Sequence, residues 1–266
     1  MKKLSSAIKP KKRFGQNFLI NPHIVNKIIL ACDLKSSDSI VEIGPGKGAL
    51  TGHIAPKVKN LFAIEKDKVL AKELSGNLEN KNITFYNADF LKFNLESLGK
   101  RLKVVGNIPY YISSPIIEKI INNRNFIDSA FIMVQLEFGK RLVASPHSKD
   151  YGSLSCFIQY YYKPSLLFKI KNTSFYPHPK VQSCFMRLDP VEDSSLKAKD
   201  EKLLFQIIRQ AFQQRRKTLR NSLAALLKIR NSQDVFEKLN IDPRLRAENL
   251  FLKDFIRIAG HVHSNC

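Results

Sequence analysis

The chain has 266 residues, enough for one large domain or for one large and one small domain. Lys and Arg number 44 against 23 Asp and Glu, so the net charge is +21, which indicates a polyanionic partner such as nucleic acid or an anionic membrane surface. No stretch approaches the roughly 18 consecutive apolar residues of a transmembrane helix, and residues 1–13 are basic without the apolar run of a signal peptide. We therefore expect a cytoplasmic protein that binds no membrane.

Cysteine and histidine spacing gives no sign of a metal site. The four cysteines are scattered without a Cys-x-x-Cys pair, and the six histidines are dispersed. We expect free thiols in a reducing compartment, no bound metal and no nucleophile triad.

Short runs rich in Ile, Val and Phe alternate with segments of helical spacing from residue 39 onward, which is typical of a parallel sheet with crossover helices. The candidate strands are 39–43, 60–64, 82–86, 102–105 and 129–134. Each ends at a loop that carries Gly, Asp, Asn or Glu. Ligands of open α/β sheets bind outside the carboxyl ends of the strands, so these loops are the first place to seek a site.

The pattern changes near residue 151. Segments 155–162, 166–170 and 181–188 are predicted as strands that add to the sheet edge in antiparallel fashion. A polar stretch follows, and apolar residues then recur at helical spacing, with helices expected over 203–212, 218–227, 233–239 and 249–259. The predicted organisation is a basic N-terminal arm at 1–13, a catalytic domain at 14–188, a linker at 189–199 and a helical RNA-docking domain at 200–266.

A glycine-rich turn follows the first predicted strand. Gly44, Gly46 and Gly48 let the backbone turn sharply and approach a ligand closely. Glu65 ends the next strand about 20 residues later, the offset at which a carboxylate accepts the ribose hydroxyls of a nucleotide. Taken alone, the turn is only a tight strand-to-helix loop, and with Glu65 it suits a dehydrogenase as well as a methyltransferase.

Three features favour the methyltransferase. The Gly-x-Gly-x-Gly spacing suits a ligand that has no pyrophosphate to hold. Asp89 ends the third strand, where it could accept a hydrogen bond from an adenine amino group, and Asn107 ends the fourth. Asp89 alone would be explained as a helix N-cap and Glu65 as a solvated strand end. Polar residues at three successive strand ends make a cofactor site the better interpretation.

The Asn107-Ile108-Pro109-Tyr110 loop suits methylation of a planar amino group. The nitrogen of such a group is a poor nucleophile until its hydrogens are held out of plane. The Asn107 side-chain oxygen and the carbonyl preceding or belonging to Pro109 could each accept one N–H. Tyr110 could stack on the base. Alignment then supplies most of the acceleration, and no strong general base is needed.

An aromatic residue in a second loop is a further candidate. Segment 175–181, Phe-Tyr-Pro-His-Pro-Lys-Val, is stiffened by prolines and carries a lysine suited to phosphate. A base that leaves its stack to react needs aromatic walls. We expect Phe175 to provide one, the alternative being that it anchors the core before a strand.

Six segments between residues 14 and 221 together resemble the ribosomal RNA adenine dimethyltransferases. They are FGQNFL at 14–19, VEIGPG at 41–46, NIPY at 107–110, YGSLS at 151–155, FYPHPKVQS at 175–183 and RRKTLRN at 215–221. The likeness is strongest to the bacterial branch that dimethylates two adjacent adenosines in the 3'-terminal hairpin loop of 16S rRNA. It implies a class I, Rossmann-like α/β methyltransferase sheet, mostly parallel with one antiparallel strand, and a small all-helical C-terminal domain.

The resemblance also implies a methyl donor and residue roles. S-adenosylmethionine is the expected donor, and 16S rRNA within a small ribosomal subunit or its precursor is the expected partner of a monomeric chain. Asn17 and Leu19 close over the cofactor, Gly44 lies against its methionine part, Glu65 holds the ribose and Asp89 takes the adenine amino group. The full cofactor set is Gln16, Asn17, Leu19, Gly44, Gly46, Glu65, Asp89, Phe90 and Asn107. The catalytic set is Asn107, Pro109, Tyr110 and Phe175.

Two departures keep alternatives open. The bacterial branch often has Leu at position 108 and Lys at position 136, where this chain has Ile108 and Leu136. Ile at 108 is common in the antibiotic-resistance branch, which modifies an adenine of 23S rRNA. The third possibility is a non-catalytic RNA-binding assembly factor. The intact Glu65, Asp89, Asn107 and Tyr110 argue against it.

The charge pattern predicts a salt-sensitive RNA affinity. Basic residues cluster at 2–13 and 209–220, and phosphate contacts from such groups release counterions. Raising the salt concentration from 50 to 200 mM should weaken rRNA binding by about a hundredfold or more while cofactor affinity changes little. Filter binding and calorimetry measure the two constants, and parallel salt dependence would contradict the basic-surface interpretation.

Overall fold

The structure is a computed structural model that describes residues 9–77, 80–191 and 197–265. The chain divides into two compact units, Met1–Gly139 with Ser165–Pro190, and Lys140–Pro164 with Val191–Cys266. The helical unit includes Lys140–Pro164 as well as the C-terminal segment. The predicted boundaries, with a catalytic domain at 14–188 and a helical domain at 200–266, stay a prediction. Residues 1–8 of the predicted arm and 192–196 of the predicted linker lie outside the described part.

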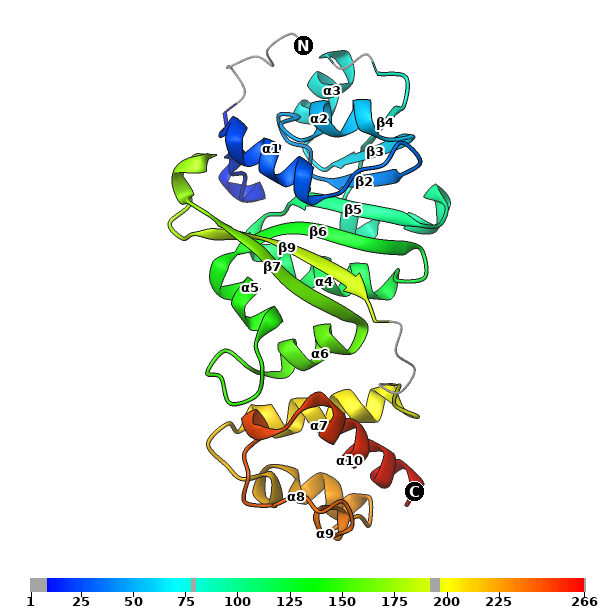
Figure 1. Cartoon of the computed structure of the whole chain (residues 1–266), viewed down its shortest axis with the longest axis vertical. Coiled ribbons are helices and arrows are strands. Elements are labelled where there is room, and N and C mark those ends of the chain that lie inside the picture. Colours follow the sequence, from blue (N-terminus) through cyan, green and yellow to red (C-terminus); the bar gives the residue numbers. More distant parts are fainter. Residues whose placement is uncertain (1–8, 78–79, 192–196, 266) are drawn as a thin grey trace. The chain divides into compact units, whose positions relative to one another are not determined.

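The first unit is built on a seven-stranded sheet with the order β4-β3-β2-β5-β6-β9-β7 (Figure 1). The strands are β2 (Ser39–Ile43), β3 (Asn60–Glu65), β4 (Ile83–Asn87), β5 (Leu102–Asn107), β6 (Ile127–Gln135), β7 (Tyr162–Ile170) and β9 (Ser183–Pro190). Strands β4, β3, β2, β5 and β6 are parallel, and β9 pairs antiparallel with β6. This arrangement confirms the predicted mostly parallel sheet.

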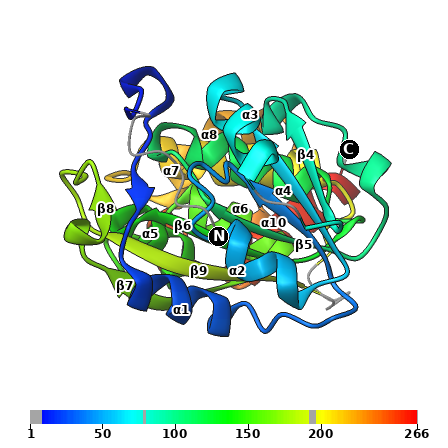
Figure 2. The ribbon, with the colours of Figure 1, turned by 90° about the horizontal axis from the view of Figure 1, so that it is seen from above.

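Helices cover both faces of this sheet (Figure 2). Helices α1 (Pro22–Ala31) and α2 (Thr51–Ile54) lie on one face, and α4 (Ser113–Asn122) lies on the other. Ile28 of α1 and Ile54 of α2 pack with Leu61 and Phe131 of the sheet in one buried cluster. The remaining helices of this part of the chain are α3 (Lys68–Asn77) and α5 (Leu136–Val143), the latter running into the second unit.

A separate two-stranded sheet joins the N-terminal segment to a distant loop. Strand β1 (Phe18–Leu19) pairs antiparallel with β8 (Phe175–Tyr176). The amide of Ile20 extends this pairing by donating to the carbonyl of Ser174, with N and O 2.9 Å apart.

The second unit is helical. Its helices are α6 (Ser153–Tyr161), α7 (Glu201–Gln213), α8 (Leu219–Ile229), α9 (Val235–Lys238) and α10 (Leu252–Ser264). The four predicted C-terminal helices are confirmed within a few residues at their ends. Asp200 and Thr218 cap α7 and α8 by accepting backbone N–H groups of their first turns. The apolar stripe of α7 faces the core of this unit, as its spacing predicts.

The prediction of a strand at 155–162 is wrong, because most of this segment forms α6. Its β-branched and aromatic residues favour a strand locally. In the fold, Ser155 Oγ accepts the N–H of Gly152 and so caps the start of a helix. Cys156 and Tyr160, one turn apart, then pack on Leu203 and Leu204 of α7. Burial of this helical stripe outweighs the local strand propensity.

Gly139 in α5 marks a close approach within the first unit. A Cβ atom at this position would collide with Cys184 Sγ and lie 3.1 Å from Met186 Sδ. Gly76 in α3 offers a matched contrast, because a Cβ atom there would meet nothing within 4 Å.

We expect Gly139→Ala to lower the free energy of unfolding by about 1–3 kcal/mol, the usual cost of overpacking a core. Gly76→Ala should raise it by up to about 1 kcal/mol, because alanine is the better helix former. Urea unfolding followed by circular dichroism measures both. Equal stability of Gly139→Ala and the wild type would show that the neighbouring strand yields without cost.

Candidate active site

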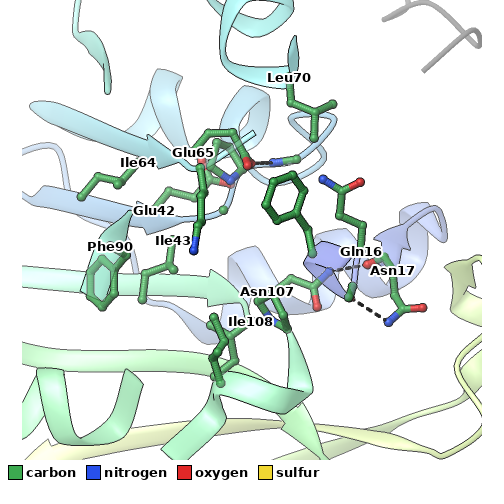
Figure 3. Close-up of a pocket in the computed structure, with 18 of the residues that line it drawn as sticks. Gln16, Asn17, Glu42, Ile43, Ile64, Glu65, Leu70, Phe90, Asn107 and Ile108 are labelled. Atoms are coloured by element: carbon green, nitrogen blue, oxygen red, sulfur yellow. Dashed lines mark hydrogen bonds between the residues drawn. The ribbon is translucent and has the colours of Figure 1, made fainter. Parts of the chain in front are cut away.

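One pocket of the first unit gathers the residues at the ends of four parallel strands (Figure 3). It lies at the carboxyl ends of β2, β3, β4 and β5 and is closed on another side by residues 14–19. All the expected site residues except Phe175 line it. They are Gln16, Asn17, Leu19, Gly44, Gly46, Glu65, Asp89, Phe90, Asn107, Pro109 and Tyr110.

The glycine turn after β2 forms the floor of the pocket. Gly44 and Gly46 have φ values of 62° and 60°, a left-handed conformation that strains any residue with a side chain. A Cβ atom on Gly44 would meet no protein atom within 4 Å, so its backbone faces open space in the pocket. The ring of Phe18 packs against Gly46, and it would lie 3.2 Å from a Cβ atom placed on Gly46. The turn thus presents bare backbone to a ligand.

Glu65 at the end of β3 is held by two backbone amides. Its Oε2 accepts the N–H of Gly46 at 3.0 Å and its Oε1 accepts the N–H of Asp67 at 2.8 Å. Burial, and to a smaller extent the carboxylate of Asp67, raise the pKa of the Glu65 carboxyl, and the backbone amides of Asp67, Gly46 and Lys66 only partly offset that effect. Each carboxylate oxygen still has a free lone pair. The group can therefore accept the two hydroxyls of a ribose.

Asp89 follows β4 and begins a 3-10 turn at Phe90–Lys92. Its Oδ1 accepts the N–H of Leu91 and its Oδ2 forms an ion pair with Lys66 Nζ at 2.8 Å. Burial of Asp89 opposes ionisation, but the hydrogen bonds from Lys66 and Leu91 outweigh it and lower the pKa of the carboxyl. Asp89 is therefore ionised at neutral pH and is a strong acceptor beside the buried ring of Phe90.

Asn107 ends β5 and bonds to the N-terminal segment (Figure 3). Its Nδ2 donates to the carbonyl oxygen of Asn17 at 2.9 Å. The orientation of the amide follows from this bond. The Oδ1 atom of Asn107 then accepts no hydrogen bond from the described residues and is available to a ligand.

In the loop after Asn107, the carbonyls of Ile108 and Pro109 differ in their hydrogen bonding. The carbonyl of Pro109 accepts the N–H of Ile112 and closes a 3-10 turn. The carbonyl of Ile108 receives no hydrogen bond from any residue that the structure describes. Tyr110 is anchored by a hydrogen bond between its hydroxyl and Ser183 Oγ of β9, and burial raises the pKa of its phenol. Its ring is fixed at the pocket wall in the neutral form.

A polar network that joins Gln16 to residues outside the predicted set holds the N-terminal segment in place. Lys11 Nζ donates to Asp67 Oδ1 at 2.8 Å, and Gln16 Nε2 donates to Asp67 Oδ2 at 3.2 Å. The Gln16 Oε1 atom accepts the backbone N–H of Lys11. The family resemblance implies Gln16, whereas Lys11, Lys66 and Asp67 were not predicted, because their partners are distant in sequence and follow no periodic pattern.

Phe175 is the one expected site residue that the structure does not bring to the pocket. Its side chain has no exposed surface and packs in the core with Leu19 and Phe185. A ring without an exposed face offers nothing for a base to stack on, so the expected aromatic wall is not formed by this residue. The placement matches the alternative reading of Phe175 as a core anchor.

The described part of the chain shows neither a metal-binding cluster nor a membrane-spanning helix. No group of three or more His, Cys, Asp or Glu side chains there could hold a metal ion. None of the helices at 9–77, 80–191 and 197–265 is both long enough and apolar enough to cross a membrane.

Glu42 lines the same pocket and was not predicted. Its carboxyl is 2% exposed, and its Oε2 atom has no hydrogen-bond partner among the described residues. Burial, and to a smaller extent the neighbouring carboxylate of Glu65, raise the pKa of Glu42 from 4.5 to about 8. The folded chain therefore binds one more proton than the unfolded chain between these pH values.

We expect the proton on the Glu42 carboxyl to make the free energy of unfolding fall as pH rises. The contribution of Glu42 is complete below pH 4.5, decreases across the window up to about 8 and is lost above it. Glu42→Gln should remove this dependence and be more stable than the wild type above pH 8. Urea unfolding at pH 5, 7 and 9 measures the difference. Parallel pH profiles for the two proteins would show that Glu42 does not titrate in this window.

Comparisons with known proteins agree with this geometry. A family model described as ribosomal RNA adenine dimethylase matches residues 7–263. A ribosomal RNA small subunit methyltransferase A of Francisella tularensis is 41% identical over 259 residues, covering 96% of this chain and 98% of the relative.

Two solved structures are also similar. A dimethyladenosine transferase of Plasmodium falciparum has a TM-score of 0.81 and 30% identity, covering 91% of this chain and 95% of the other. The 23S rRNA methyltransferase ErmE has a TM-score of 0.69 and 24% identity, covering 93% of this chain and all of the other, and this likeness concerns the fold alone. The match of the family model along nearly the whole length, together with the curated relative, shows that this chain belongs to the ribosomal RNA adenine dimethylase family.

Proposed function

We propose that the chain transfers methyl groups to N6 of two adjacent adenosines in the 3'-terminal hairpin loop of 16S rRNA, giving N6,N6-dimethyladenosine during assembly of the small ribosomal subunit. The observation that carries the proposal is the pair of oxygen acceptors at the end of β5, Asn107 Oδ1 and the Ile108 carbonyl, which accept no hydrogen bond within the described chain. The Francisella relative, named for the small subunit, supports 16S rRNA as the substrate.

The pocket residues fit the methyl donor of this family, S-adenosylmethionine. The donor carries its methyl group on a positively charged sulfur, which is an excellent leaving group. Glu65 would hold the ribose hydroxyls, Asp89 would accept the adenine amino group, and the bare backbone at Gly44 would lie against the methionine part. The open space at Gly44 and the spare lone pairs of Glu65 are the structural observations behind this assignment.

The acceptor is activated by geometry. The N6 lone pair of adenine is delocalised into the ring, and holding both N–H bonds toward fixed oxygens brings that lone pair out of conjugation. In the first transfer, Asn107 Oδ1 and the carbonyl of Ile108 would each accept a hydrogen bond from one of these N–H groups. In the second transfer to the same nitrogen only one N–H remains, and one of the two oxygens would accept it. The carbonyl oxygen of Pro109 already accepts the N–H of Ile112, so the carbonyl of Ile108, which precedes the proline, is the better second acceptor. The proton leaves to water after transfer, so no side chain has to act as a strong base.

The target base also needs a platform. Tyr110 lines the pocket, and its hydroxyl bond to Ser183 fixes the ring. Stacking on such a ring contributes about 1–3 kcal/mol per base. The base enters by leaving its own stack, which is easiest in an unpaired loop of rRNA. We assign the reaction to one chain, because every group named here comes from it, and to the cytoplasm, where ribosomal subunits of bacteria are assembled.

The experiment that tests this function uses the purified chain, methyl-labelled S-adenosylmethionine, and 16S and 23S rRNA in separate reactions. Mass spectrometry of nuclease digests locates the label. We expect N6,N6-dimethyladenosine at two neighbouring positions of the 16S terminal hairpin. Label only in 23S rRNA would favour the resistance-type activity, and label in neither would leave a non-catalytic RNA-binding protein.

Substitution of Asn107 should separate catalysis from cofactor binding. We expect Asn107→Ala to lower the transfer rate by about a hundredfold or more, since one preorganised hydrogen-bonding group is lost. Cofactor affinity, measured by calorimetry, should change far less. Asn60→Ala is a matched control, because Asn60 is a half-buried asparagine at the opposite, amino end of β3. Equal loss of transfer and cofactor affinity in Asn107→Ala would contradict the acceptor role.

A further inference from the structure

The small sheet of β1 and β8 has two faces with different surroundings. Phe18 lies opposite Tyr176, and Leu19 lies opposite Phe175. Side chains directly opposite each other on antiparallel strands project to the same face, and successive residues alternate between faces. Leu19 and Phe175 are buried in the core. Phe18 and Tyr176 therefore share the other face.

This other face continues from the pocket to the surface. Phe18 lines the pocket, whereas Tyr176 is 57% exposed. Ile20, two residues after Phe18 and still bonded to Ser174 of the other segment, is 55% exposed. We call the side chains of Phe18, Ile20 and Tyr176 the Tyr176 face. It is an apolar surface that begins at the pocket wall and ends in solvent.

The charges around the Tyr176 face favour a polyanion over a protein or lipid partner. Lys47 Nζ lies 5.2 Å from the centre of the Phe18 ring, and Lys180 follows Tyr176 in the same exposed loop. An aromatic ring beside ammonium groups matches a nucleotide, whose base stacks while its phosphate meets the cation. The net charge of +21 acts in the same direction.

We propose that Tyr176 stacks on the base next to the adenosine that occupies the pocket, with the intervening phosphate close to Lys47. The inference rests on the proposed function. When one base of a single strand swings out to react, its neighbour loses a stacking partner. An exposed tyrosine ring beside the pocket replaces that partner and holds the strand in register. In this substrate the neighbour of one target is the other, so Tyr176 holds one adenosine while its neighbour reacts.

The test is a binding titration with a 16S terminal hairpin that carries 2-aminopurine next to a target adenosine, in the presence of S-adenosylhomocysteine. Stacking on an aromatic ring changes the fluorescence of 2-aminopurine. We expect Tyr176→Ala to weaken hairpin binding about tenfold and to abolish the fluorescence change, as loss of one stacked base does. Tyr176→Phe should retain both. Leu30→Ala, at an exposed position of α1, should leave both unchanged.

Several results would overturn the inference. Equal hairpin affinity of Tyr176→Ala and the wild type would do so, and so would a loss of cofactor affinity in Tyr176→Ala, which would indicate a structural role. Weakened binding to ribosomal particles with unchanged binding to the bare hairpin would assign the Tyr176 face to a protein contact. Failure of the wild type to methylate 16S rRNA would count against the proposed function, whereas the hairpin titration decides the stacking role by itself.

Discussion

The hydrogen bond from Asn107 Nδ2 to the carbonyl of Asn17 is the interaction on which the proposed chemistry depends. It joins the end of a central strand to a segment 90 residues earlier in the chain. It also decides which atom of the Asn107 amide faces the pocket. With the nitrogen committed to the backbone, the oxygen is left to accept a hydrogen from a substrate amine. This one hydrogen bond thus closes the pocket wall and leaves a hydrogen-bond acceptor, rather than a donor, facing the pocket.

The parallel sheet supplies the rest of the site. Because the carboxyl ends of its parallel strands meet at one edge, the backbone at Gly44 and the side chains of Glu65, Asp89 and Asn107 come together although they are far apart in sequence. The three carboxylates near this edge, Glu65, Asp67 and Asp89, have different hydrogen-bond and ion-pair partners. Backbone amides hold Glu65, Lys66 balances Asp89, and Asp67 is satisfied by Lys11 and Gln16. The last contact ties the N-terminal segment to the strand that carries Glu65.

Much of the fold could be predicted because the buried strands are short runs of β-branched and aromatic residues bounded by polar turns. Strand order then places their end residues at one edge, which is why most of the expected site lines one pocket. Segment 155–162 has the same local composition, yet most of it forms a helix. The reason is packing of Cys156 and Tyr160 against α7, and such long-range contacts leave no local signal.

The site residues that were not predicted are also held by long-range contacts, which leave no local signal in the sequence. Ion pairs of Lys11 and Lys66 form between segments whose separation shows no period. The choice between Phe175 and Tyr176 is a matter of register. Two adjacent aromatic residues in a strand must face opposite sides, and only the pairing with β1 decides which one is buried. The sequence indicates an aromatic residue in this loop but not which of the two is accessible.

The most direct measurement is a crystal structure of the chain with S-adenosylhomocysteine. We expect the ribose hydroxyls to lie within hydrogen-bond distance of Glu65 and the sulfur atom to face the side-chain oxygen of Asn107. A ligand bound elsewhere, or a sulfur atom turned away from the loop at 107–110, would contradict the proposed arrangement.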